Sequence, residues 1–167
     1  MKKLLLTLTM LLCVSGAFGQ TAQKLIAKYK ALPNAEYKEN TEEVRRNIEE
    51  NKKKGTFGLA EKDYDFVLKH FKKSEEVELV LDGNQKNELG REIQALNGYE
   101  MLVAQNDQKE TSPNYLVRVY GKVKGDEVKD LFVRCDISGK TVLQHFEGKV
   151  KKDLMLKATL DGDLISF

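Results

Sequence analysis

The N-terminal part of the chain carries apolar residues at helical spacing. Leu25, Ile26 and Tyr29 fall on one side of a helix. Thr21 is suited to cap the start of this helix, and Pro33 is suited to end it. The pattern therefore predicts a short amphipathic helix between these two residues.

A second helix is expected from 40 to 54, but its apolar stripe is thin. Val44 and Ile48 are its apolar positions, whereas acids fill the first turn and lysines fill the last turn, which suits the helix dipole. Such a helix is either a solvated surface helix, which the composition favours, or an element that docks a partner. A third helix is expected from about 60 to 72, with core side chains at Phe66, Val67 and Phe71.

From residue 75 onward the apolar period changes to two, which is typical of strands. Val77, Leu79 and Leu81 alternate with other residues. A helix follows and is expected to end at Asn97–Gly98, because glycine is common just after a helix. The next strand is expected at 99–105.

The C-terminal part of the chain predicts a β-meander. Three strands within 115–148 are joined by the short turns Gly125–Asp126 and Ser138–Gly139. A polar loop at 106–113 precedes the meander, and a short helix is expected at 151–158 after it.

Together these elements predict an α+β fold. We expect an antiparallel sheet that includes the C-terminal β-meander, with helices packed on one face and a helical N-terminal part. Residues 20–73 are expected to be mainly helical and 74–167 mainly strand. They are assigned to one domain, because no Pro-, Gly- or Ser-rich linker separates them.

Residues 1–19 have the order of a signal peptide. Two lysines precede an apolar run, and small residues follow up to Gly19. Cleavage is expected before Gln20, with cleavage before Phe18 as the second choice. The chain is therefore expected to be exported to the periplasm or to the extracellular space.

Two other fates of this segment stay open. A retained membrane anchor is disfavoured because the apolar stretch is shorter than the roughly 20 residues that span a bilayer. No stable membrane span is then expected after the signal is removed. A lipid anchor on Cys13 is disfavoured because Leu12, and not a small residue, precedes it.

Removal of the signal peptide changes the charge and the cysteine content. The full sequence has 28 Lys and Arg and 26 Asp and Glu, and the loss of two lysines leaves 26 of each sign. This balance excludes a strongly basic nucleic-acid binder, so no nucleic acid partner is expected. Cys135 remains as the only cysteine. It shares an alternating face with Leu131 and Val133, and we interpret it as a core residue and not a reactive thiol.

Candidate catalytic and metal-binding residues are few. His70 and His145 have no neighbour at metal-ligand spacing, and His145 is expected to point outward from its strand, away from Cys135. The paired carboxylates, such as Glu75 and Glu76, lie among basic residues and are interpreted as solvated, whereas a catalytic acid needs apolar surroundings. No catalytic residue, metal site or cofactor is therefore assigned.

One apolar group in the meander falls on the face opposite the main apolar row. It consists of Leu116, Tyr120 and Phe132. Either a helix covers these residues, which is the commoner arrangement, or they form a docking surface. Our hypothesis for a site takes the second alternative: Tyr120 or Phe132 is exposed and serves self-association or the binding of a protein partner in the cell envelope.

One pattern in the C-terminal part of the chain is characteristic. It consists of the segment Glu88–Val103, the meander and the closing segment Phe146–Val150. Together with the signal peptide and the segment Leu25–Tyr29, this pattern resembles domain-of-unknown-function family 4252, or a close sister family, of small exported Bacteroidetes proteins. The resemblance covers mainly the last 90 residues, and the charged helix at 40–54 departs from it. It implies a small envelope protein without an assigned activity, so it assigns no functional residue.

Two classes of function remain. The first is an exported envelope protein that acts as a non-enzymatic protein-binding, sensory or accessory module. The alternative is an enzyme, such as a hydrolase, whose site is dispersed through the fold. A deep pocket with converging polar groups would favour the enzyme.

Overall fold

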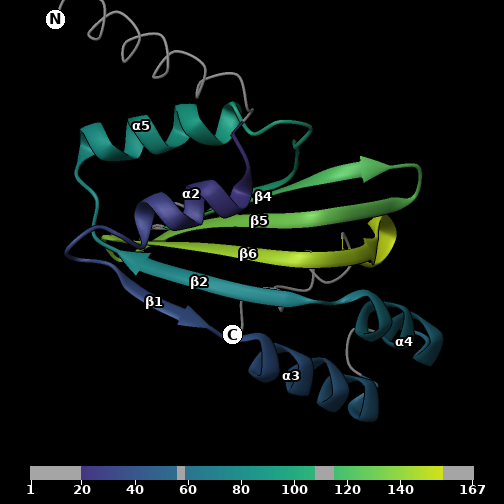
Figure 1. Ribbon diagram of the computed structural model, residues 1–167. Helices are drawn as coiled ribbons and strands as arrows, with labels where there is room; N and C mark the ends of the chain where they lie inside the picture. Colours follow the sequence, from purple (N-terminus) through teal and green to yellow (C-terminus); the bar gives the residue numbers. More distant parts are fainter. Residues whose placement is uncertain (1–19, 56–58, 108–114, 156–167) are drawn as a thin grey trace, which may run out of the picture.

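The computed structural model describes residues 20–55, 59–107 and 115–155 (Figure 1). The signal-peptide prediction for 1–19 lies outside the described residues. The main helices are α2 (Ala22–Tyr29), α3 (Thr41–Lys54), α4 (Glu61–His70) and α5 (Gly83–Gln94), and residues 152–155 form one further helical turn. The strands are β1 (Glu36–Glu39), β2 (Lys73–Leu79), β3 (Glu100–Asp107), β4 (Tyr115–Lys124), β5 (Glu127–Ile137) and β6 (Lys140–Lys151).

The strands form one antiparallel sheet in the order β1-β2-β6-β5-β4-β3. The predicted α+β fold with a C-terminal meander is thereby confirmed. Gly125 and Gly139 adopt left-handed backbone angles, with φ of 65° and 84°, at the two predicted turns of the meander. Strand β1 was not predicted, because Tyr37 is the only large apolar residue in its four positions.

Helices α2 and α5 cover one face of the sheet (Figure 1). The Thr21 side chain caps α2 by accepting a hydrogen bond from the Lys24 N–H, and Asp82 and Gln85 form a capping box at the start of α5. The apolar sides of both helices then meet the sheet. This first core cluster includes Leu25, Ile26, Val77, Leu89, Ile93, Phe132 and Leu143.

Helices α3 and α4 lie on the other side of the sheet (Figure 1). Strand β5 carries apolar side chains on both faces, because Phe132 belongs to the first cluster whereas Val133 belongs to a second one, against which Leu131 packs. All the helices were expected on one face of the sheet, but α2 and α5 cover the first face whereas α3 and α4 cover the second. The second face therefore has its own helical cover.

The expected exposure of Tyr120 or Phe132 is wrong. Their exposed fractions are 9% and 0%, and both side chains belong to the first core cluster beneath α2 and α5. Leu116 is half-buried. The correction has a simple cause: strand alternation shows which residues share a face, but it does not show that two helices cover that face.

The interpretation of Cys135 as a core residue is confirmed. Its side chain is buried in the second cluster with Val133, and Leu131 packs against the same cluster. Burial raises the pKa of the thiol, and the nearby Asp136 carboxylate adds to this effect. Both effects suppress the thiolate, so Cys135 is suited to packing and not to nucleophilic chemistry.

Candidate functional site

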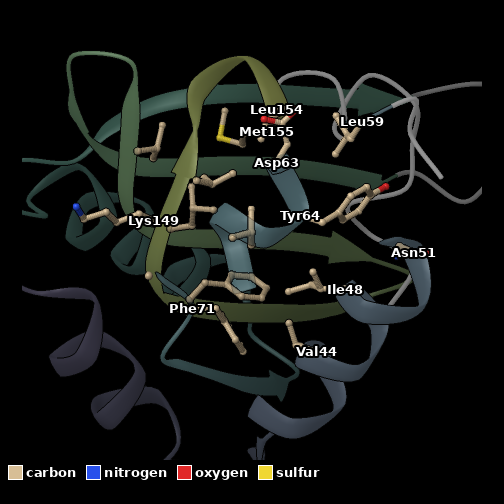
Figure 2. Close-up of a pocket in the computed structure, with 16 residues that line it drawn as sticks. Val44, Ile48, Asn51, Leu59, Asp63, Tyr64, Phe71, Lys149, Leu154 and Met155 are labelled. Atoms are coloured by element: carbon tan, nitrogen blue, oxygen red, sulfur yellow. The ribbon is translucent and has the colours of Figure 1, made fainter. Parts of the chain in front are cut away.

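An apolar cavity of about 190 Å³ lies between α3, α4 and the second face of the sheet (Figure 2). Its walls come from segments that are far apart in the sequence, and Leu154 and Met155 at the end of the described chain also line it. The apolar side chains that form it include Val44, Ile48, Val67, Phe71, Leu131 and Phe146.

The thin apolar stripe of α3 forms one wall of this cavity. Val44 and Ile48 are one helical turn apart and both line it. From α4, Tyr64 and Val67 line it at a spacing of three residues. Two narrow stripes leave a gap between them and the sheet that a wider apolar face would have filled.

Strand β6 approaches the end of α4 closely at Gly148, which also lines the cavity. A Cβ atom at this position would lie 3.0 Å from the carbonyl oxygen of His70 and 3.1 Å from the Cα of Phe71. Both neighbours are backbone atoms, which cannot swing away as a side chain could. Glycine is therefore needed here to bring strand and helix together at the cavity wall.

Charged side chains at the rim are paired with one another or with the backbone. Arg45 lies over the Phe71 ring, with 5.6 Å between the guanidinium carbon and the ring centroid, and donates a hydrogen bond to the Phe71 carbonyl. Lys151 Nζ lies 3.2 Å from Asp63 Oδ1. The Lys149 side chain extends away from the cavity (Figure 2). The cavity thus provides apolar contact, and these groups do not converge as an acid and a base would.

A second arrangement, on the first face of the sheet, consists of Glu75, His145, Lys73 and Tyr37. Glu75 and His145 are only 5% and 3% exposed, and His145 Nδ1 lies 3.3 Å from Glu75 Oε1. Lys73 Nζ and the Tyr37 hydroxyl both donate to Glu75 Oε2, over 2.9 Å and 3.2 Å. The predictions of a solvated Glu75 and an outward His145 are therefore wrong.

Burial by itself would raise the pKa of the Glu75 carboxyl. Hydrogen bonds from Lys73 and His145, together with the Lys73 charge, outweigh burial, so the pKa is lowered from its ordinary value. A carboxylate held in its charged form in this way is an ion-pair partner and not a general acid at neutral pH.

Cys135 cannot serve as the nucleophile of a catalytic dyad with His145, because the two side chains lie on opposite faces of the sheet. Cys135 belongs to the cluster on the second face, whereas His145 pairs across the strands with Phe132, whose side chain is on the first face. The expected separation of Cys135 from His145 is confirmed. We interpret the Glu75 cluster as a polar network, buried at Glu75 and His145 and open to solvent at Lys73 and Tyr37, that orders β1, β2 and β6.

The other candidate residues behave as local structure. His70 ends α4, and its Nδ1 lies 2.8 Å from the Phe66 carbonyl oxygen. Among the described residues, no three His, Cys, Asp or Glu side chains gather in a way that could hold a metal ion. In the same part of the chain, no helix has the length and apolar character needed to cross a membrane.

Comparison with known proteins identifies no relative. No protein-family model matches the chain, and no match was found among the curated proteins or the solved structures. The resemblance described above therefore stays a prediction, and the site has to be interpreted from its own geometry.

The cavity was not predicted from the sequence, and the predicted docking surface lies elsewhere in the fold. Tyr120 and Phe132 lie in the first core cluster, whereas the cavity is on the second face. The thin stripe of α3, with only Val44 and Ile48, was the available signal, because a helix with so few apolar positions leaves the space beside it incompletely filled.

Proposed function

We propose that this chain is an exported, non-enzymatic binding module whose ligand places a small apolar group in the cavity between α3, α4 and the sheet. The observation that carries the proposal is the cavity itself, which is lined almost entirely by apolar atoms. Burial of an apolar group there is favourable because both the group and the lining side chains are removed from water.

The size of the cavity limits the ligand. An apolar protein cavity of roughly 150 Å³ is large enough to bind benzene. At about 190 Å³, the present cavity suits a single aromatic ring with a short alkyl substituent, or a branched alkyl group of similar volume. We therefore propose a small apolar molecule as the occupant and not a polar metabolite.

The chemistry around the cavity supports binding over catalysis. Asp63 is engaged by Lys151, and Lys149 lies 3.3 Å from Glu127. A hydrolase would need a nucleophile or an activated water beside a general base, held within reach of the bound ligand. The paired charges of the rim instead give the cavity a hydrated, polar edge.

Ethylbenzene is a suitable probe, and its binding can be measured by saturation-transfer NMR. The wild-type protein is expected to bind it. Val67→Trp places a large ring inside the cavity and is expected to weaken binding at least about tenfold. Val80→Trp is the matched control, because Val80 is 57% exposed and does not line the cavity, and it is expected to bind normally.

Two results would overturn the proposal. The first is the absence of ethylbenzene binding to the wild-type protein, which would leave an apolar side chain of a protein partner as the occupant to test. The second is equal binding by the Val67→Trp and Val80→Trp variants, which would place the binding outside the cavity. Far-ultraviolet circular dichroism of both variants checks that each is folded.

A further inference from the structure

A small polar pocket lies at the start of α3, apart from the charged rim of the apolar cavity. Its volume is about 100 Å³. Asn40, Glu43 and Asn47 are spaced by three and four residues, so they lie on one side of α3, and Glu76 of β2 also lines the pocket. Val44 lines both this pocket and the apolar cavity.

Asn40 is the least usual member of this group. It is only 6% exposed, and its side-chain oxygen accepts no hydrogen bond from the described residues. Asparagine at this position before a helix commonly caps the first turn, but here no side-chain capping bond is formed. A buried acceptor without a donor costs free energy. The Asn40 amide oxygen is therefore available to a ligand bound in the pocket.

The charges and donors of the pocket favour a positive ligand. Glu43 and Glu76 supply two carboxylates, whereas Lys38 supplies one ammonium group. Gln144 Nε2 donates to Glu76 Oε2 over 2.6 Å and holds that carboxylate in place. Lys38 donates to Glu43, but its side chain is 57% exposed and can withdraw into water.

We propose that this pocket binds a hard divalent cation of the calcium type. Its ligands would be the carboxylates of Glu43 and Glu76 and the side-chain oxygens of Asn40 and Asn47. Calcium is bound in proteins by carboxylate and amide oxygens in a flexible geometry, whereas magnesium demands a stricter one and gives up its water reluctantly. Lys38 is the internal counter-ion that neutralises Glu43 when the cation is absent.

The cation would tie α3 to the sheet. Glu43, Asn40 and Asn47 belong to the helix and its cap, whereas Glu76 belongs to β2, so one ion joins two elements. The two acids in the first turn of α3 offset the positive end of the helix dipole, which would otherwise repel a cation. Because Val44 lines both spaces, binding here also steadies a wall of the apolar cavity, although the proposal does not depend on a ligand there.

Thermal unfolding of the purified protein in calcium chloride, after treatment with a chelator, tests the proposal. The melting temperature is expected to rise and saturate with calcium, with a dissociation constant on the order of 10⁻⁴–10⁻³ M, as in extracellular calcium modules. Magnesium chloride at equal ionic strength is expected to give a smaller rise. No response to calcium would show that the pocket holds only water and would overturn the proposal.

Three variants distinguish a bound cation from a general salt effect. Asn40→Ala should abolish the calcium response without lowering the melting temperature of the metal-free protein, because the lost oxygen has no hydrogen bond there. Lys38→Gln should strengthen calcium binding, because the competing ammonium is removed. Glu78→Gln is the control and should keep the calcium response, because Glu78 lies two residues after Glu76 on β2 and does not line the pocket. A calcium response that survives Asn40→Ala, or weaker binding by Lys38→Gln, would overturn the assignment.

Discussion

The buried pair Glu75–His145 makes stability depend on pH in a way that one substitution can test. Glu75→Gln keeps the size and shape of the side chain and removes its charge. In the folded protein this carboxylate receives hydrogen bonds from the Lys73 ammonium, the Tyr37 hydroxyl and the His145 ring. The amide oxygen of the variant can still accept from Lys73 and Tyr37, but these hydrogen bonds are no longer made to a charged acceptor, and His145 loses its carboxylate partner.

The size of the effect follows from the charge and burial of the site. A hydrogen bond to a charged group stabilises a fold by about 1.5–3 kcal/mol, and a buried donor left without a partner costs a similar amount. His145 is 3% exposed, so water cannot replace the acceptor that it loses, whereas Lys73 and Tyr37 are partly exposed and can bond to water instead. We expect Glu75→Gln to lower the free energy of unfolding by about 1.5–3 kcal/mol at pH 7.

The pH dependence identifies the charge as the cause. The pKa of Glu75 in the folded protein lies below its ordinary value of 4.5. Its contribution is therefore fully present above that ordinary value and is lost as the pH falls through the lower, folded-state pKa. The contribution of the Glu75 charge to the difference between wild type and Glu75→Gln should therefore shrink as the pH falls below about 4.5.

Urea unfolding followed by circular dichroism at a series of pH values measures this difference. Glu78→Gln is the matched control on the same strand, because Glu78 pairs with Lys140 at the surface and is expected to contribute no more than about 1 kcal/mol. A deficit for Glu75→Gln that is unchanged at acid pH would show that the variant acts through packing. A variant as stable as wild type at pH 7 would refute the buried ion pair.

Three further outcomes are expected. Replacement of Tyr120 and Phe132 by Ser should unfold the protein or lower its melting temperature strongly, because truncation of one buried aromatic side chain already costs about 3–5 kcal/mol; a variant with an unchanged melting temperature would contradict their burial. Cys135→Ala should keep the fold at a cost of about 1 kcal/mol in chemical unfolding, and Cys135 should react slowly with a thiol reagent, whereas fast labelling without denaturant would contradict its place in the core. Intact mass measurement of the native protein should give a chain without lipid that begins at Gln20, or secondarily at Phe18, and a diacylglyceryl-modified or uncleaved chain would be the contrary result.

Features that depend on neighbours in the sequence could be predicted from it. The cap at Thr21, the turn glycines Gly125 and Gly139 and the alternation around Cys135 each place their element or face where the structure has it. In each case the decisive interaction spans only a few residues, as in a cap or a two-residue turn, or follows from the two-residue repeat of a strand. The fold class could be predicted for the same reason.

Tertiary contacts decided the rest. Alternation along β4 and β5 placed Tyr120 and Phe132 on one face, but only the packing of α2 and α5 against that face made them core. Glu75 appears solvated beside Lys73 in the sequence, yet it is buried because β6 brings His145 against it from 70 residues away. The cavity likewise forms only where α3 and α4 pack against the sheet. Such environments arise where segments distant in the chain meet. A local pattern of apolar and polar residues specifies which faces are apolar, but it does not specify which elements pack against them.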